Sequence, residues 1–392
     1  MARPEGTGER PPGRLGVLLV SHSLGGGGAE RFAATLAARL DRGRFRPAVC
    51  VATGGGAYPV PADVPVAELG YRGLLDLPGA VVRLARRLRR EPPDLVLSNV
   101  LSTNCLTGAA LGLVAERPAW VARVGNAPEH GDPLLQRLWA RRVYPRADRI
   151  VTNSRGLREG FLRYYPGLEE RCRALPNPTD FQEIDRLAAE TPPETLRVRL
   201  EDDLSAGAAR LLWVGRLGRQ KRPDLALETL ARLRALPGGP LDARLWICGE
   251  GPWRGRLERR AAALGLGGAV RFLGFQENPF TLMRAADLLL LTSDFEGLPN
   301  ALIEAQGLGL PAVATRCDFG PDEVVADGET GVLVPTGDPE ALAAAAAALL
   351  GDPERRRRMG EAAARRAREL FGFERVLPRW EALLEEAARG AR

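Results

Sequence analysis

Several features that define common protein classes are scarce or missing in this chain of 392 residues. Its five cysteines are scattered, with no Cys-x-x-Cys pair and no histidine cluster. This argues against a zinc site or a disulfide framework and is typical of a reducing cytoplasm. No run of about 18 apolar residues occurs, so we expect no membrane-spanning helix. Residues 1–14 are polar, rich in Pro and Gly, and lack the apolar core of a signal peptide, so we expect a disordered leader on a cytoplasmic protein.

Lysine is nearly absent, because arginine supplies all of the 55 basic residues except Lys221. The single lysine is either a chance exception to a compositional bias or a site that needs a compact ammonium group. Histidine is almost as rare, with only His22 and His130 in the chain. The sequence therefore offers few residues for acid–base chemistry near neutral pH.

The net charge of +6 is placed unevenly, because the first 190 residues contain 27 arginines and only 20 acidic residues. An anionic partner for this half, either lipid headgroups or a phosphate-bearing acceptor, is one interpretation. A solvated, arginine-rich surface is the other. We expect no nucleic-acid partner.

The segment VVRLARRLRR (81–90) leaves the same choice open. In a helix its apolar residues would form a stripe, and the arginines would surround it. Such a helix lies in the headgroup layer of an anionic membrane or packs on its own sheet. The first alternative predicts peripheral contact with the inner face of the membrane.

From residue 15 onward, short apolar runs alternate with amphipathic helical stretches, as in doubly wound α/β domains. We expect strands at 15–21, 47–52, 94–99, 120–124 and 149–154, then at 210–215, 243–249, 270–274, 287–293 and 311–315. The segment LPNPTD separates the two series, and a polar stretch, 183–208, follows it. This pattern predicts two Rossmann-like domains, 15–178 and 179–371. We expect the last helix, 372–392, to pack back on the first domain.

A glycine-rich loop, SLGGGGAER (23–31), directly follows the first strand and opens a helix. Gly26 and Gly27 would let the backbone approach a ligand closely, and the helix N-terminus favours anions. A dinucleotide-binding domain also needs an acidic residue at the end of its second strand. That strand ends without one, which disfavours a dehydrogenase.

Two cations follow the first strand of the second series, in VGRLGRQKRPD (214–224). After Gly215, Arg216 and Lys221 would converge at the carboxyl edge of the sheet, where open α/β sheets bind their ligands. Two cations beside a helix start suit a diphosphate. The alternative is ordinary surface charge on a loop.

Two carboxylates flank a helix start in SDFEGLPNALIEA (293–305). Glu296 lies in the loop before Pro299, a favoured first helical residue, and Glu304 lies within the helix. The first N–H groups of that helix would be free for a phosphate; they belong to Asn300, Ala301 and Leu302. The two carboxylates could grip sugar hydroxyls at one end of a ligand and ribose at the other, or they are ordinary surface glutamates.

Together these segments resemble the second domain of the retaining group 1 (family 4) glycosyltransferases. The resemblance runs almost unbroken from about residue 210 to 336, through ICGEGPWRGRLERR, ADLLLLTSDFEGLPNALIEAQGLGLPAVAT and DGETGVLVP. The first half matches more weakly, through GGGGAER, RADRIVTNS and the PNP segment. The resemblance implies the GT-B fold, in which two Rossmann-like domains face each other across a cleft.

The family pattern implies roles for the residues at matching positions. Arg216 and Lys221 would neutralise the donor diphosphate, Glu304 would bind the ribose and Glu296 the transferred sugar. The remaining donor contacts would come from Gly215, Gly297, Leu298, Asn300, Ala301, Leu302, Phe275, Gly26 and Gly27. The loop 317–323 would close the sugar pocket, although its Asp318-Phe319 departs from the smaller residues expected there.

Many relatives place a histidine of the first domain near the reacting sugar carbon. His130, in RVGNAPEHG, falls roughly at that place and is our candidate, with Asn126 and Arg123 as alternatives. No Asp-x-Asp triplet occurs that could hold a metal on the diphosphate, so we expect no metal requirement.

The resemblance predicts a retaining transfer of a sugar from a nucleoside diphosphate, most simply UDP, to an acceptor hydroxyl. The acceptor would be a sugar, a lipid-linked sugar or a polysaccharide, and no cofactor is expected beyond the nucleotide sugar itself. The alternatives are a sugar-nucleotide epimerase of the same fold and a non-catalytic homologue that binds sugar nucleotides.

Overall fold

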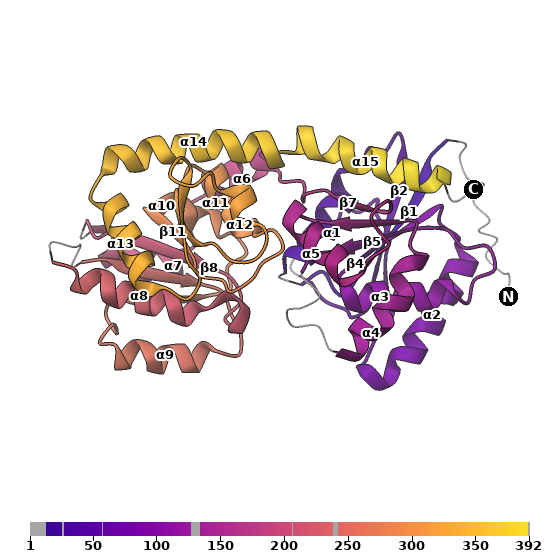
Figure 1. The fold of residues 1–392 in the computed structure, drawn as a ribbon, viewed down its shortest axis with the longest axis horizontal. Helices are drawn as coiled ribbons and strands as arrows, with labels where there is room; N and C mark the ends of the chain where they lie inside the picture. The colour runs from indigo at the N-terminus through magenta and orange to yellow at the C-terminus, as the bar shows by residue number, and fades with distance from the viewer. Residues whose placement is uncertain are drawn as a thin grey trace.

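The computed structural model describes residues 13–25, 27–56, 58–126, 134–205, 207–237 and 242–390. Most of the expected leader lies outside these residues, as do His130 and Gly26. Two parallel β-sheets form the centres of two α/β domains, joined by a pair of helices along one side (Figure 1). The predicted class of two doubly wound, Rossmann-like domains is therefore confirmed.

The first sheet has seven strands in the order β3-β2-β1-β4-β5-β6-β7. Its strands are β1 (Leu15–Ser21), β2 (Phe45–Val51), β3 (Val66–Glu68), β4 (Leu95–Asn99), β5 (Ala119–Val124), β6 (Arg149–Thr152) and β7 (Cys172–Ala174). Its helices are α1 (Gly28–Arg39), α2 (Leu77–Arg90), α3 (Leu101–Leu111), α4 (Leu134–Val143) and α5 (Arg155–Tyr164), with short 3₁₀ helices at Leu74–Asp76 and Tyr144–Arg146.

The continuous apolar runs form these strands because both faces of the sheet are covered. In β1, Leu18 and Val20 pack into the core beneath α2 and α3. Val17 and Leu19 point the other way, into the core beneath α1 and the last helix. Side chains alternate along a strand, so every residue of such a run finds an apolar neighbour.

The second sheet has six strands in the order β10-β9-β8-β11-β12-β13. They are β8 (Arg210–Val214), β9 (Arg244–Cys248), β10 (Val270–Gly274), β11 (Leu288–Leu291), β12 (Ala312–Thr315) and β13 (Gly331–Val334). The helices of this half are α6 (Phe181–Ala188), α7 (Glu194–Ser205), α8 (Pro223–Ala235), α9 (Arg254–Ala263), α10 (Phe280–Ala285), α11 (Asn300–Gly307), α12 (Pro321–Val324), α13 (Pro339–Leu350) and α14 (Pro353–Phe371), with a 3₁₀ helix at Arg219–Lys221.

Both strand orders contain the switch point at which doubly wound sheets bind ligands. In each sheet the first strand lies beside the fourth, so successive connections run outward in opposite directions from that pair. The switch points are β1 beside β4 and β8 beside β11.

The sequence missed three strands at sheet edges, β3, β7 and β13, and the nature of one connection. The edge strands β3 and β7 are only three residues long, too short for an alternating pattern to stand out. The polar stretch 183–208 is not a plain linker, because it contains most of α6 and all of α7. In α7 only Leu196 and Leu200, one turn apart, are buried hydrophobic residues among many charges, so the apolar signal was narrow.

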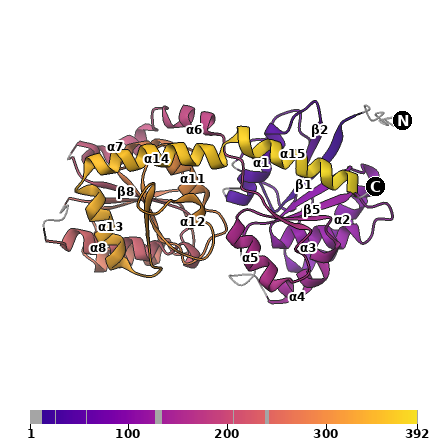
Figure 2. The same cartoon turned by 45° about the horizontal axis from the view of Figure 1, so that its top comes forward.

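The chain crosses between the two sheets twice, and the two crossings lie side by side. The Thr179 N–H donates to the Phe371 carbonyl at 2.9 Å, and the Phe373 N–H donates to the Thr179 carbonyl at 3.2 Å. Helix α15 (Phe373–Gly390) then lies along the first domain, while α14 lies along the second (Figures 1 and 2). Trp380 of α15 is buried and donates its indole N–H to the Pro176 carbonyl at 2.8 Å. The boundary expected between 178 and 179 falls at this crossing.

Helix α2 resolves the choice left open for segment 81–90. Its apolar residues Leu84, Ala85 and Leu88 are buried in the core of the first domain. The stripe therefore packs on its own sheet and is not free to enter a headgroup layer. Arg86 and Arg90 point into solvent on the other side. Within the described residues, no helix is both long and apolar enough to cross a membrane.

Candidate active site

Lys221 and Glu296 meet at the switch point of the second sheet. Lys221 ends the 3₁₀ helix after β8, and Glu296 lies in the loop after β11, the neighbouring strand. The Lys221 ammonium lies 2.6 and 2.7 Å from the two carboxylate oxygens of Glu296. Ser293 Oγ donates to the same carboxylate at 2.6 Å. Glu296 is only 3% exposed, so this is a buried carboxylate held by a cation and a hydroxyl.

Backbone contacts fix the two loops that carry this pair. The Gln220 side-chain amide donates to the Phe295 carbonyl at 3.0 Å, and the Asp294 N–H donates to the Gln220 carbonyl at 2.9 Å. Thr292 Oγ1 donates to the Lys221 carbonyl at 2.9 Å. The two motifs that the sequence presents separately thus form one preorganised edge, which an active site requires.

Arg216 lies at the same edge but, unlike Lys221, it has no ion-pair partner among the described residues. It lies two residues after β8, and its side chain is exposed. Gly215 before it is packed tightly, since a Cβ on Gly249 would lie 1.9 Å from the Gly215 carbonyl oxygen. The Arg216 guanidinium is therefore free to meet an anion arriving at this edge.

The N-terminus of α11 opens onto this edge, with two differences from the prediction. The helix begins at Asn300, and Pro299 is its cap rather than its first residue. The backbone N–H groups of Asn300 and Ala301 have no acceptor within the described part of the chain. The Leu302 N–H, expected to be free, donates to the Pro299 carbonyl at 3.1 Å. Two N–H groups, not three, can thus serve an anion here.

The loop before α11 contributes through its backbone. Leu298 is buried in the core of the second domain, so its side chain is not available to a ligand. Gly297 is buried against the first domain, where a Cβ would lie 2.0 Å from the Gly125 carbonyl oxygen and 3.0 Å from Asn153 Oδ1. Only glycine fits at this close approach of the two domains.

Glu304 faces the first domain from within α11. Its side chain is 8% exposed and forms an ion pair with Arg31 of α1. This carboxylate raises the pKa of Arg31 above its usual value. The Arg31 guanidinium also lies over the rings of Tyr58 and Phe280, 5.2 and 5.7 Å from their centroids. Arg31 belongs to the GGGGAER segment, whose sequence alone does not indicate this contact.

The glycine loop of the first domain reaches the same place. Gly27 caps the N-terminus of α1, and Gly28 begins the helix. A Cβ on Gly28 would lie 2.9 Å from the side-chain nitrogen of Asn300. The carboxyl edges of the two sheets thus face each other, and the glycine loop lies opposite the open end of α11.

A buried arginine connects the first sheet to α11. Arg123, at the end of β5, is 2% exposed and donates to the amide oxygens of Asn99 and, at 2.6 Å, Asn177. The Asn177 nitrogen in turn donates to Asn300 Oδ1 at 2.9 Å. Burial lowers the pKa of Arg123 to about 10, against the opposing effect of Glu30. Arg123 therefore stays cationic at neutral pH. Because it is buried, it holds Asn99 and Asn177 in place rather than replacing His130 at an exposed position.

Phe275 directly follows β10, the edge strand of the second sheet, at its carboxyl end. It is 42% exposed, which is uncommon for a large aromatic residue in this chain. The Gly274 carbonyl before it accepts from the Gly249 N–H at 2.8 Å, so the backbone at Phe275 is anchored. An exposed ring on an anchored backbone can stack on a planar ligand.

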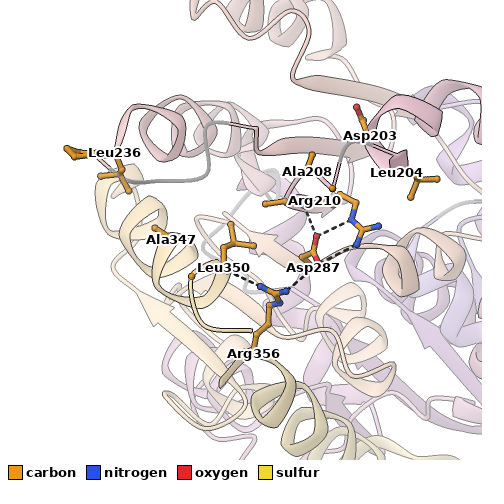
Figure 3. A pocket seen from close by; sticks show the side chains of 13 residues that line it. Asp203, Leu204, Ala208, Arg210, Leu236, Asp287, Ala347, Leu350 and Arg356 are labelled. Atoms are coloured by element: carbon orange, nitrogen blue, oxygen red, sulfur yellow. Dashed lines mark hydrogen bonds and ion pairs between the residues drawn. The ribbon is translucent and has the colours of Figure 1, made fainter. Parts of the chain in front are cut away.

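A cavity of about 540 Å³ lies at the opposite edge of this sheet (Figure 3). Arg210 begins β8 and Asp287 directly precedes β11, so both mark the amino ends of the central strands. Asp287 pairs with Arg210 at 3.1 Å and with Arg356 at 3.7 Å (Figure 3). The fourth charged residue that lines the cavity, Asp203, pairs with Arg244 and Arg271. All four charged groups therefore have partners already, and ligands of such sheets bind at the other edge. No group of three or more His, Cys, Asp or Glu residues able to hold a metal occurs in the described ranges.

Comparison with protein families matches most of the chain in two pieces. Residues 202–366 match the model described as glycosyl transferases group 1, and residues 26–183 match the model described as glycosyltransferase family 4. The chain is 28% identical over 324 residues to the lipopolysaccharide core biosynthesis glycosyltransferase LpsE of Rhizobium meliloti, covering 81% of this chain and 84% of LpsE.

Two further similarities extend over nearly the whole chain. The GalNAc-alpha-(1->4)-GalNAc-alpha-(1->3)-diNAcBac-PP-undecaprenol alpha-1,4-N-acetyl-D-galactosaminyltransferase of Campylobacter jejuni is 26% identical over 335 residues, or 83% of this chain and 86% of that protein. The crystal structure of HepE of Anabaena in complex with UDP-glucose superposes with a TM-score of 0.80 at 21% identity. That alignment covers 95% of this chain and all of HepE.

Proposed function

Because this chain belongs to the group 1 (family 4) glycosyltransferases and has their GT-B fold, we propose that it is a retaining enzyme that uses a UDP-linked sugar. The observation that carries the proposal is the Lys221–Glu296 pair beside the open N-terminus of α11. A cation, a buried carboxylate and free backbone N–H groups at one switch point suit the sugar and diphosphate of such a donor.

The positive groups act on the leaving diphosphate. As the bond between the sugar carbon and the phosphate oxygen breaks, negative charge grows on the phosphate. Arg216, Lys221 and the N–H groups of Asn300 and Ala301 would oppose that charge. These groups supply what a divalent metal supplies elsewhere, so we propose that the reaction needs no metal.

The nucleoside would lie along the edge of the sheet beyond the diphosphate. Glu304 would accept hydrogen bonds from the ribose hydroxyls, and Phe275 would stack on the base. Arg31 pairs with one Glu304 oxygen, so the other oxygen can accept from ribose. The HepE complex contains UDP-glucose, which supports a uridine nucleotide for this chain as well.

The environment of Glu296 favours reaction on one face of the sugar. A double-displacement mechanism would need this carboxylate as a free nucleophile, but Lys221 and Ser293 hold it. We propose that the acceptor oxygen bonds to the sugar carbon on the face that the phosphate leaves. The acceptor proton passes to the departing phosphate oxygen, so that the sugar keeps its configuration. Glu296 would bind a hydroxyl of the moving sugar.

The acceptor would reach the site from the first domain. LpsE is named for lipopolysaccharide core biosynthesis, and the Campylobacter jejuni relative is named for an undecaprenol-linked acceptor. A lipid-linked or polysaccharide acceptor and peripheral contact with the inner face of the membrane are therefore our proposal for a cytoplasmic enzyme. With the stripe of α2 buried, contact would come from exposed arginines alone; on α2 and α4, which flank α3, these include Arg86, Arg89, Arg90, Arg141 and Arg142.

One assay distinguishes this proposal from the two alternatives. Purified protein is mixed with UDP-sugars, with and without a lipid extract, and both released UDP and the sugar nucleotide are measured. A transferase releases UDP in proportion to acceptor. An epimerase converts the sugar nucleotide without needing acceptor, and a non-catalytic homologue only binds it. Absence of acceptor-dependent UDP release with every sugar would contradict the proposal.

A further inference from the structure

The loop between β12 and α12 contains one of the two non-glycine residues with positive φ in the described part of the second domain, the other being Arg222. Phe319 has φ of 63°, in the left-handed region that an aromatic residue rarely adopts. Such a conformation persists only where the surroundings hold it, and it is often found at functional sites. Phe319 is also the residue whose bulk departs from the family pattern.

The Phe319 ring lies against α5 of the first domain, over two glycines spaced one turn apart. A Cβ on Gly160 would lie 2.4 Å from the ring Cζ, and a Cβ on Gly156 would lie 3.1 Å from Cδ1. Glycine inside a helix lowers its stability relative to alanine. The two glycines therefore make a groove that the ring fills, and Phe319 joins the apolar core of the first domain.

Glu323 docks on the same helix, two residues after the start of α12. Its carboxylate accepts from the backbone N–H of Arg155 at 3.1 Å and of Gly156 at 2.9 Å. A carboxylate at a helix N-terminus satisfies unpaired N–H groups and interacts favourably with the helix dipole. The first turn of α5 is thus capped by a residue of the other domain.

The other side of this loop holds the proposed sugar-binding residue. The Glu296 N–H donates to the Asp318 carbonyl at 3.1 Å. Next to Phe319, Gly320 packs on the loop before α11, where its Cβ would lie 2.7 Å from the Gly297 carbonyl oxygen. One short loop therefore contacts α5 on one side and the backbone of Glu296 on the other.

We propose that Phe319 and Glu323, seated on Gly156, Gly160 and the N-terminus of α5, form a latch that couples domain closure to the position of Glu296. Both are positioning residues, because neither touches the reacting atoms. The inference rests on the proposed function for its effect on turnover. The closure itself is a property of the protein without ligand and can be measured separately.

The first arm of the test measures closure without any substrate. Small-angle X-ray scattering of the ligand-free full chain should show a larger radius of gyration for Phe319→Ala than for the wild type. Gly160→Ala should have the same effect, because its methyl group occupies the space of the ring. The matched control is Gly255→Ala on α9, whose Cβ would have only the side chain of Arg259 within 4 Å. Unchanged scattering of Phe319→Ala would overturn the latch whatever reaction the protein catalyses.

The second arm measures turnover and UDP affinity. Phe319→Ala should lower turnover roughly tenfold, the size of an ordinary coupling between sites, while UDP binding by calorimetry stays unchanged. In the Phe319→Ala background, Gly160→Ala should cause no further loss, and it should raise the melting temperature because alanine favours the helix. If Gly160→Ala lowers turnover further in the Phe319→Ala background, the proposed contact between the Phe319 ring and the glycine groove is wrong. If no UDP-sugar is turned over but the scattering changes as expected, the proposed function fails and the latch stands.

Discussion

The two domains have the same fold and strand order at their centres, yet they build the site in different ways. At the edge of the second sheet, Lys221 and Ser293 both contact Glu296 within their own domain. At the edge of the first sheet, Arg31 reaches across to Glu304, and Asn177 reaches to Asn300. One domain carries a preassembled cluster, and the other completes it from across the interface. We infer that the second domain sets donor chemistry and that the first sets how the domains meet.

The largest expected effect is the loss of a cation from the second domain. Lys221→Ala and Arg216→Ala should each lower turnover by about 10²-fold or more at saturating donor, since each removes charge that stabilises the leaving diphosphate. The control is Arg259→Ala, an exposed arginine of α9, which should keep the wild-type rate. Near wild-type rates in both variants would refute the diphosphate assignment.

The same two variants should differ in thermal stability, because Lys221 forms an ion pair with a buried carboxylate and Arg216 has no such pair in the described part of the chain. Arg216 is exposed and without an ion pair among the described residues, so Arg216→Ala should unfold at the wild-type temperature. Lys221→Ala leaves the buried carboxylate of Glu296 without its cation, which costs stability. Thermal unfolding measures both. Equal melting temperatures would show that the Lys221–Glu296 pair adds nothing to the fold.

Removing a buried cation from the first domain should lower the stability of the protein. Arg123→Met keeps the bulk but leaves the amide oxygens of Asn99 and Asn177 without a buried donor. Each unsatisfied group costs about 1–3 kcal/mol, so we expect a loss of about 2 kcal/mol or more in the free energy of unfolding by urea. Glu340→Ala, in an exposed pair on α13, serves as the control. A stable Arg123→Met protein with lost turnover would instead make Arg123 a catalytic residue.

This difference between the domains also explains what the sequence could predict. The strands of the second domain and the placement of Arg216, Lys221, Glu296 and Glu304 follow from short, contiguous motifs. A βα loop and a helix start carry their own geometry, so a local pattern suffices.

The contributions of the first domain could not be found in the same way. Arg31 and Asn177 are ordinary in their segments and gain their contacts only when two distant parts of the chain meet. Gly156 and Gly160 similarly suggest a weak helix until Phe319, more than 150 residues later, fills the groove. The apolar stripe of α2 fits a membrane or a core equally well, and only the packing decides between them.

A smaller effect is expected from the surface arginines of the first domain. Binding to phosphatidylglycerol vesicles at low salt should be lost at high salt and weakened in Arg86→Glu/Arg90→Glu, since each arginine contributes on the order of 1 kcal/mol near an anionic surface. Arg256→Glu/Arg259→Glu, on α9 of the second domain, makes the same charge change elsewhere. Co-sedimentation is the measurement, and no binding at low salt would end the membrane proposal.

The smallest expected effect is that of metal removal. Turnover should be unchanged in excess EDTA, because the cations and the N-terminus of α11 act on the diphosphate. The same assay with added Mg²⁺ or Mn²⁺ completes the test. Activity that disappears with EDTA and returns with either ion would reveal a metal site that this account does not include.

The most direct test of the division of roles is calorimetric titration of UDP alone into Glu304→Ala and Glu296→Ala. Ribose contacts hold substrate and transition state alike, whereas contacts to the moving sugar change during reaction. We expect Glu304→Ala to weaken UDP binding, and Glu296→Ala to leave UDP affinity near the wild-type value while lowering turnover. A larger loss of UDP affinity in Glu296→Ala than in Glu304→Ala would contradict the assignment of the donor site.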